Sequence, residues 1–306
     1  MPQDARSLRL ILNGKASGNP LIRPAVEKIR QAGFPLEVRV TWESGDAARF
    51  AHEACRDGVD VVIVGGGDGS VNEVAGGVLE ADPESRSALA VLPLGTANDF
   101  ATGCGIPTAD PLAALRLAAE GKIAPIDVGK VNGRVFVNVA SAGFGAAVTT
   151  QTPKELKDAI GGAAYALMGL VSFLKLQPYH GEATLPDGSK RKGNMILAAI
   201  CNARLAGGGF QVGPKALLDD GLLDVMIIHD FPGYDFGALL QELTELREDG
   251  RYVSYKQIPS FHVEVEEDLQ VNADGEPIVG RSFHFEAVPK ALSFVLPPGA
   301  PLRENE

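Results

Sequence analysis

Hydrophobic and polar positions follow two alternating patterns in the first 125 residues. Short apolar runs rich in β-branched residues are separated by stretches in which apolar residues recur at helical spacing. The predicted strands cover residues 9–13, 36–42, 59–64 and 88–94, and the predicted helices cover 22–32, 46–56, 71 onward and 111–120. This alternation is typical of a parallel sheet with helices on both faces. We therefore expect an α/β domain.

The pattern changes after residue 126, where mostly strand candidates follow. They cover residues 136–140, 195–201, 222–229, 261–265 and 283–288. Turn signals such as Pro186-Asp187-Gly188 and Asp274-Gly275 separate them and predict an antiparallel β domain. Two helical stretches interrupt it, a buried helix at 161–176 and another at 234–249. We expect domains at residues 1–132 and 133–289, with 290–306 free to return to the first.

Composition narrows the class of protein. The 306 residues carry 28 Lys and Arg against 39 Asp and Glu, a net charge of −11, and no basic cluster stands out. Nucleic-acid binding and simple adsorption to anionic membranes are therefore disfavoured. The three cysteines lack Cys-x-x-Cys spacing, so neither disulfides nor a zinc knuckle is expected and a cytoplasmic location is the simplest. Residues 161–176 are too few to span a bilayer.

The stretch Val61–Glu73 predicts a strand, a glycine-rich loop and a helix. Glycines let a ligand approach the backbone, and a helix N-terminus presents free N–H groups to an anion such as a phosphate. Ser70 and Glu73 fit a capping box that needs no ligand. Asp68 is not explained in this way, because its carboxylate would repel a phosphate unless a cation lay between them.

A second loop, Gly95–Asp99, follows the next predicted strand, with Thr96 expected to cap a helix. The carboxyl ends of parallel strands meet at one edge, so both loops are expected to face one crevice. The Rossmann fingerprint fails because Ser70 or Asn72 stands where glycine is required, and a Walker loop fails because Ala16 replaces its Ser or Thr.

Residues 66–73, Gly-Gly-Asp-Gly-Ser-Val-Asn-Glu, followed by residues 93–101, Pro-Leu-Gly-Thr-Ala-Asn-Asp-Phe-Ala, are the most specific motifs. Together they resemble the catalytic domain of diacylglycerol kinases and, among these, the YegS-type bacterial lipid kinases. Further segments with counterparts in that type extend the resemblance nearly end to end: 11–15, 39–43, 207–209, 220–223 and 274–277. The glycine motif alone is less specific, since NAD kinases and phosphofructokinases carry it.

The resemblance implies an ATP site in a cleft between the α/β domain and a C-terminal β-sandwich. The residues expected to hold ATP are Gly67, Asp68, Gly69, Ser70, Val71, Asn72 and Glu73, with Thr41 and Thr96 near the nucleotide and Asn13 and Lys15 beside the phosphates. Thr41 is equally well explained as a strand-end hydroxyl, and Lys15 as an exposed turn lysine.

A second metal site is also implied by the resemblance. It consists of the Asp220 side chain and the carbonyl groups of Leu217 and Leu222, and it would hold Mg²⁺ or Ca²⁺ apart from the Mg²⁺ of ATP. Without the resemblance, these residues predict only a turn.

Trp42 is expected in the core.

Glu276 is the catalytic residue that the resemblance implies, although Asp274-Gly275 before it predicts only a hairpin turn. Glu276 would accept the proton of a lipid hydroxyl late in phosphoryl transfer, while Asp68 organises metal and phosphate.

The expected function is ATP-dependent phosphorylation of a membrane lipid, with phosphatidylglycerol favoured and diacylglycerol left open. The alternatives are a sphingosine-like kinase, an NAD kinase-like enzyme and a nucleotide-binding regulator without turnover. We expect transient contact with the inner face of the membrane and no nucleic-acid partner. The oligomeric state stays open.

Overall fold

The computed structural model describes residues 5–143, 178–232 and 235–303. Contacts divide the chain into two compact units. Unit 1 contains Met1–Val128, Leu218–Asp220 and Pro289–Glu306, and unit 2 contains Gly129–Leu217 and Gly221–Val288. The chain therefore returns to unit 1 twice, and the short return at 218–220 carried no sequence signal.

Unit 1 is built on a parallel sheet in the strand order β2-β1-β3-β4. Its strands are β1 (Leu8–Leu12), β2 (Leu36–Val40), β3 (Val61–Gly66) and β4 (Ala88–Pro93). The end of β15 (Glu276–Leu296) adds a further parallel strand, because Phe294 pairs with Leu89. The predicted α/β sheet is confirmed, and the last apolar run of the chain lies in it.

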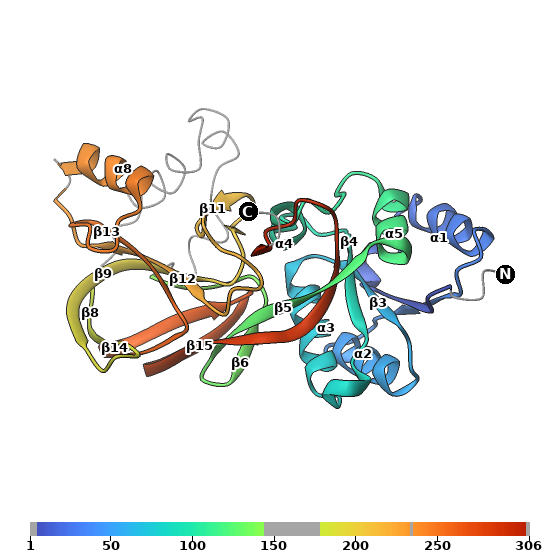
Figure 1. Ribbon diagram of the computed structural model, residues 1–306, viewed down its shortest axis with the longest axis horizontal. Helices are drawn as coiled ribbons and strands as arrows, with labels where there is room; N and C mark the ends of the chain where they lie inside the picture. The colour runs from blue at the N-terminus through green and yellow to red at the C-terminus, as the bar shows by residue number, and fades with distance from the viewer. Residues whose placement is uncertain (1–4, 144–177, 233–234, 304–306) are drawn as a thin grey trace. The chain divides into compact units, whose positions relative to one another are not determined.

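Helices cover both faces of this sheet (Figure 1). They are α1 (Ile22–Gln31), α2 (Asp46–Arg56), α3 (Asp68–Leu79), α4 (Asp99–Gly103) and α5 (Pro111–Glu120), with short 3-10 turns η1 (Gly14–Ala16) and η2 (Pro83–Ser85). Helices α1 and α5 pack on alternate residues of the strands, including Leu10, Ile63 and Ala90. Helices α2 and α3 contact each other and the sheet. Alternation along a strand sends successive side chains to opposite faces, so each strand serves two helical layers.

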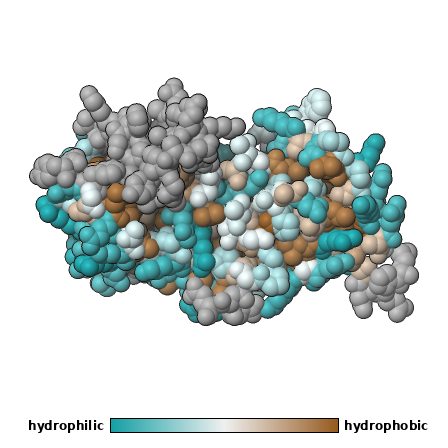
Figure 2. All heavy atoms as spheres, turned by 90° about the horizontal axis from the view of Figure 1, so that it is seen from above, coloured by the Kyte–Doolittle hydropathy of each residue, from teal (hydrophilic) through white to brown (hydrophobic). Residues whose placement is uncertain are grey.

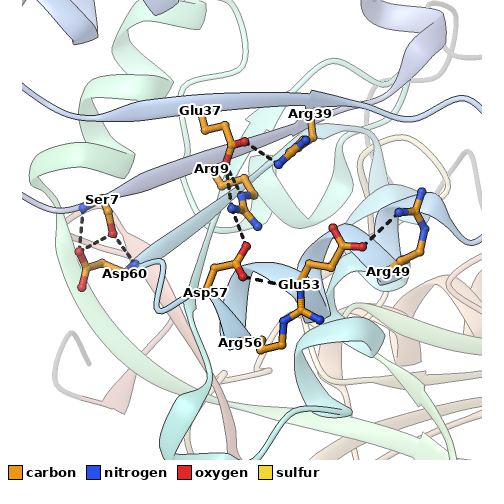
Figure 3. A network of polar contacts seen from close by, with 9 residues as sticks. All are labelled: Ser7, Arg9, Glu37, Arg39, Arg49, Glu53, Arg56, Asp57 and Asp60. Atoms are coloured by element: carbon orange, nitrogen blue, oxygen red, sulfur yellow. Dashed lines mark hydrogen bonds and ion pairs between the residues drawn. The ribbon is translucent and has the colours of Figure 1, made fainter.

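One charged residue, Arg9, lies inside this sheet and interrupts the apolar run of β1. Its side chain is 6% exposed and pairs with Glu37 at 2.8 Å and Asp57 at 2.9 Å (Figure 3). The Arg9 guanidinium lowers the pKa of the Asp57 carboxyl. A buried charge is tolerated when it is paired in this way, so the strand stays in the core.

Unit 2 is an antiparallel sheet, as predicted. Its strands are β5 (Lys122–Val131), which begins in unit 1, β6 (Arg134–Phe136), β7 (Val139–Ala142), β8 (Tyr179–Thr184), β9 (Lys190–Cys201), β12 (Leu223–His229), β13 (Val253–Ile258) and β14 (Ser260–Ala273), followed by β15. Strands β10 (Leu205–Ala206) and β11 (Phe210–Gln211) form a separate two-stranded sheet. Strands β7 and β8 both lie between β9 and β14 and pair with both. One hydrophobic core of unit 2 contains Ala198, Ile200 and Val225. The residues next to them in sequence, such as Ala199 and Met226, belong to a second core on the other face of the sheet, where α8 (Phe236–Glu245) packs.

Two sequence-based expectations change at this level. Trp42 is 94% exposed, so its placement in the core was wrong. It lies beyond the end of β2 at Val40, after Thr41, and its exposed side chain packs against neither face of the sheet. The helix expected at 161–176 lies outside the described residues, and the helix expected at 234–249 is α8.

The surface is mixed in character. Figure 2 shows hydrophobic residues gathered on part of the unit 1 face, among hydrophilic ones. No helix in the part of the chain that the structure describes is long and apolar enough to span a bilayer.

Candidate functional site

The two glycine loops meet at the carboxyl edge of the unit 1 sheet. Gly66 pairs with Pro93, and the Leu94 N–H donates to the Gly66 carbonyl at 2.9 Å. A Cβ atom placed on Gly95 would lie 2.5 Å from the Cα atom of Gly67. Only glycine fits this backbone contact, because any side chain at Gly95 would force the loops apart. The loops therefore form one surface, as their positions after neighbouring strands predict.

Asp68 connects the two loops through hydrogen bonds. Its carboxylate accepts from the Asp99 N–H at 3.1 Å and from the Phe100 N–H at 2.9 Å, the first residues of α4. Asp68 thus caps α4 from a neighbouring helix, so it has a structural role in the loop surface. A carboxylate has about four acceptor sites, so this cap leaves acceptor capacity for a further ligand.

The caps predicted on the two helices are wrong. Helix α3 begins at Asp68, so Ser70 lies inside its first turn and cannot be its cap. Helix α4 begins at Asp99 after Asn98, which adopts a φ of 53° and bonds Gly95 with its side-chain amide, whereas Thr96 is exposed. Backbone contacts between the loops move both helix starts, and a local sequence pattern does not encode such contacts.

Ser70 and Glu73 have different partners from those of a capping box. The Ser70 hydroxyl accepts from the Asn13 side chain at 3.3 Å, and the Glu73 carboxylate accepts from the Gly45 N–H at 3.0 Å. Gly67 is the N-cap of α3 and has no side-chain cap. Gly67 therefore offers no side-chain acceptor to the first N–H groups of α3. Such N–H groups at a helix N-terminus suit an anion.

Two further observations bear on whether a ligand fits here. The Oδ1 atom of Asn72 is buried and has no hydrogen-bond partner among the described residues. Asn72 lies one helical turn after Asp68, on the same face of α3. A Cβ atom on Gly69 would meet no atom within 4 Å, so the first turn is open to a ligand.

The strand ends beside these loops hold Thr41, Asn13 and Lys15. The Thr41 hydroxyl accepts from the Gly14 N–H at 3.2 Å, as expected of a strand-end hydroxyl. Asn13 accepts from the Lys15 N–H at 3.0 Å and so brings this loop to Ser70. A cavity of about 290 Å³ adjoins the loops, lined by Lys15, Ala16, Asn19, Leu21, Pro93, Leu94, Gly95, Asn98, Thr108, Ala109 and Pro111.

Glu276 belongs to unit 2 and is exposed at the start of β15. It follows a two-residue hairpin turn, because Ala273 pairs with Glu276 and both Asp274 (φ 48°) and Gly275 (φ 100°) have positive φ. The predicted turn is confirmed. Glu276 and Asp68 lie in different units.

The Asp274 carboxylate anchors this turn, a feature that the sequence did not suggest. It accepts from the N–H groups of Val137 at 2.6 Å, Asn138 at 3.0 Å and Val139 at 2.9 Å. The Asp274 N–H in turn donates to the Val139 carbonyl at 3.1 Å. The turn that carries Glu276 is therefore fixed to the start of β7.

The loop expected to hold a second metal is tied to the C-terminal segment. The Asp220 carbonyl accepts from the Arg303 guanidinium at 2.9 Å, and the Leu218 N–H donates to the Pro301 carbonyl at 2.9 Å. Among the described residues no group of three His, Cys, Asp or Glu side chains could hold a metal ion. The expected site uses one carboxylate and two carbonyls, so it is of another kind and stays a prediction.

Comparison with known proteins identifies the family. The model of the diacylglycerol kinase catalytic domain matches residues 7–131, and that of the YegS C-terminal NAD kinase β-sandwich-like domain matches residues 138–296. A probable lipid kinase YegS-like of Chromohalobacter salexigens is 45% identical over 298 residues, 97% of this chain and 95% of the relative. The chain belongs to the YegS-type lipid kinases.

Other relatives of this family agree over the same length. A probable lipid kinase YegS of Shigella flexneri is 42% identical over 294 residues, 96% of this chain and 97% of the relative. The crystal structure of a candidate diacylglycerol kinase from Bacillus anthracis has a TM-score of 0.80 at 27% identity, covering 98% of this chain and 100% of that one. The α/β domain and C-terminal β-sandwich expected from the sequence are confirmed, and the chain is a phosphotransferase with an alcohol acceptor.

Proposed function

We propose that the chain is an ATP- and Mg²⁺-dependent kinase that phosphorylates a hydroxyl of a membrane lipid head group, with phosphatidylglycerol as the substrate. The observation that carries the nucleotide part is the contact between the Gly67 and Gly95 loops at the N-terminus of α3. The lipid part rests on the family. The acceptor is proposed from the resemblance to YegS-type lipid kinases.

The residues at the start of α3 suit a nucleotide phosphate with its metal ion. The N–H groups of the first turn favour anionic oxygens, and Gly69 leaves room for them. The Asp68 carboxylate and the unpartnered Asn72 Oδ1 lie on one helix face. Both are oxygen donors, the kind of ligand that Mg²⁺ prefers. When bound, ATP supplies the phosphoryl group and Mg²⁺ offsets the charge of its oxygens.

Glu276 is the proposed base. Its carboxylate accepts the proton of the lipid hydroxyl, whose oxygen forms the new bond to phosphorus as the bond from phosphorus to the ADP oxygen breaks. Asp274 supports this role because it fixes the turn before Glu276. The carbonyl groups of Leu217 and Leu222 with the Asp220 carboxylate are proposed to hold a structural Mg²⁺ or Ca²⁺.

A substrate panel tests the proposal. The protein is incubated with γ-labelled ATP, Mg²⁺ and, separately, phosphatidylglycerol, diacylglycerol, sphingosine or NAD, and the products are separated by chromatography. We expect label on phosphatidylglycerol. Label on diacylglycerol alone would mean that diacylglycerol is the substrate in place of phosphatidylglycerol. Label on NAD would contradict the assignment of a lipid substrate. ATP binding by calorimetry with no label on any acceptor would favour a regulator without turnover.

A further inference from the structure

Strand β2 lies at the edge of the unit 1 sheet. It pairs with β1 on one side, and no described strand pairs with its other side. Every second residue bonds β1, since the Leu8 N–H donates to the Pro35 carbonyl and the Thr41 N–H donates to the Leu12 carbonyl. The backbone groups of the residues in between point away from β1, towards the free side. These outward-facing residues are Leu36, Val38 and Val40.

Among the described residues, few features protect this edge. The Arg30 side chain covers the beginning of β2, where it donates to the Leu36 carbonyl at 2.9 Å. At the other end the Val40 side chain is 46% exposed. Residues 36–40 contain no proline, and their pairing with β1 has no bulge. Prolines, bulges and charges are the usual means of keeping a second chain away from an edge strand. Of these, β2 has only charges.

The two charges of β2 fit a second copy of the same strand. Glu37 and Arg39 are 44% and 45% exposed, and they pair with each other at 2.8 Å (Figure 3). When two copies of β2 pair antiparallel about Val38, Glu37 of each copy lies opposite Arg39 of the other. The same alignment sets the outward-facing residues opposite one another, Val38 to Val38 and Leu36 to Val40. Backbone pairing and charge pairing therefore agree on one alignment.

Neighbouring alignments are disfavoured by the same charges. Only the outward-facing residues can bond across the edge, so the alignment can shift only in steps of two residues. A shift in one direction sets Glu37 opposite Glu37 of the other copy, and a shift in the other direction sets Arg39 opposite Arg39. Like charges directly opposite each other destabilise a sheet. The strand thus selects one partner alignment and works against the others.

We infer that two copies of this chain associate through their β2 strands, which pair antiparallel about Val38 and join the two unit 1 sheets into one. Such an interface uses the same surface on both copies, as a two-fold dimer does. Dimerisation goes beyond the proposed function, because it requires neither nucleotide nor lipid. In each copy the interface ends one residue before Thr41, at the strand end beside the glycine loops.

The first test measures the dimer. The full chain, without nucleotide or lipid, is studied by sedimentation velocity from low to high micromolar concentration, and unfolding curves confirm that each variant folds. We expect the wild type to dimerise reversibly. Arg39→Glu should weaken the dimer about tenfold or more, because carboxylates then lie opposite each other in two symmetry-related pairs.

The matched control for this test is Arg116→Glu. It makes the same change of charge at an exposed residue of α5 in unit 1, so it reports general repulsion between chains of net charge −11. The control should dimerise like the wild type. A wild type that stays monomeric throughout, a dimer that Arg39→Glu leaves intact, or equal weakening by both variants would overturn the inference.

The second test determines the alignment. Glu37→Cys and Arg39→Cys chains are oxidised with copper phenanthroline, separately and as a mixture, and Arg9 keeps Asp57 as its partner in the first. The wild type is the control, because its three cysteines are buried. Opposite residues of a non-hydrogen-bonded antiparallel pair lie close enough for a disulfide.

We expect a disulfide-linked dimer in the mixture and not in either variant alone. Equal linkage within one variant alone, or no linkage in any sample, would overturn the proposed pairing. Kinase activity is measured separately, so failure here leaves the proposed function untouched.

Discussion

At the scale of single residues, the Asp274 carboxylate is the strongest structural feature of unit 2 near the proposed base. It gathers three consecutive backbone N–H groups, at residues 137–139. Hydrogen bonds to a charged acceptor contribute more than neutral ones. An Asp before Gly predicts a hairpin turn, but only the folded chain brings β7 to it.

Removal of this anchor should disturb Glu276 more than the rest of the protein. We expect Asp274→Ala to lower the free energy of unfolding by roughly 2 kcal/mol or more. Asp274→Asn keeps one acceptor and a residue that tolerates positive φ, so it should fold and lower kcat with little change in KM. Asp187→Asn is the control, because the Asp187 carboxylate lies in another Asp-Gly turn and bonds Ser189, two residues away, through its N–H and its hydroxyl. A fall in kcat no larger than that of the control would contradict the positioning role.

Asp46 gives a pH dependence that the single tryptophan can report. The Trp42 and Glu43 N–H groups and then the Arg49 guanidinium hold the pKa of the Asp46 carboxyl at about 2, below its usual 3.8. The folded pKa is lowered, so this contribution is present above pH 3.8 and is lost as pH falls towards 2. We expect the fluorescence anisotropy of Trp42 to be constant above pH 4 and to fall below it. Asp46→Ala, which removes the acceptor of the Trp42 and Glu43 N–H groups, should show the low value already at neutral pH.

At the scale of elements, the spacing of hydrophobic residues predicted nearly every strand and helix of unit 1. For α2 and α5 the predicted first and last residues are those observed. Helix starts at the site were not predictable, because they depend on a partner loop. Asp68 in the first glycine loop caps α4, which follows the second glycine loop. The Ser70 hydroxyl accepts a hydrogen bond from Asn13 on a third loop. Local rules describe a helix in isolation and cannot include such contacts.

The C-terminal end of β15 is an integral strand of unit 1. Phe294 is fully buried, and its ring lies 5.0 Å from that of Phe100. We expect Phe294→Ala to cost about 3–5 kcal/mol of the free energy of unfolding. Val279→Ala on the same strand, where the side chain is 66% exposed, should cost less than about 0.5 kcal/mol. Denaturant unfolding measures both, and similar costs would contradict this account of the strand.

At the scale of the whole molecule, the position of the site in unit 1 could be predicted, because its loops lie at the edge of a parallel sheet. Less of unit 2 could be predicted from the sequence. Loops after neighbouring parallel strands must meet, which is why Gly67 and Gly95 could be paired from the sequence. A cavity of about 560 Å³ in unit 2 is lined by residues of five strands, β8, β9, β12, β13 and β14, and no periodicity in the sequence encodes it.

We expect the proposed membrane contact to be apolar rather than purely electrostatic. With a net charge of −11, long-range attraction to anionic lipid is weak. We expect binding to phosphatidylglycerol vesicles to fall less than about threefold between 50 and 300 mM salt, since apolar burial is not screened. Co-sedimentation measures it, and binding abolished by moderate salt would contradict an apolar contact.

The central claim is that the joined glycine loops with Asp68 form the phosphoryl-transfer site. The most direct measurement is transfer of label from γ-labelled ATP to phosphatidylglycerol by the wild type, Asp68→Asn and Asp110→Ala. Asp110 caps α5 through the N–H groups of Leu112 and Ala113, so its variant loses a comparable cap. We predict label with the wild type and Asp110→Ala, and at least a hundredfold less with a folded Asp68→Asn, as for loss of a charge-stabilising group. Undiminished labelling by Asp68→Asn, or no labelled lipid with the wild type, would contradict the account.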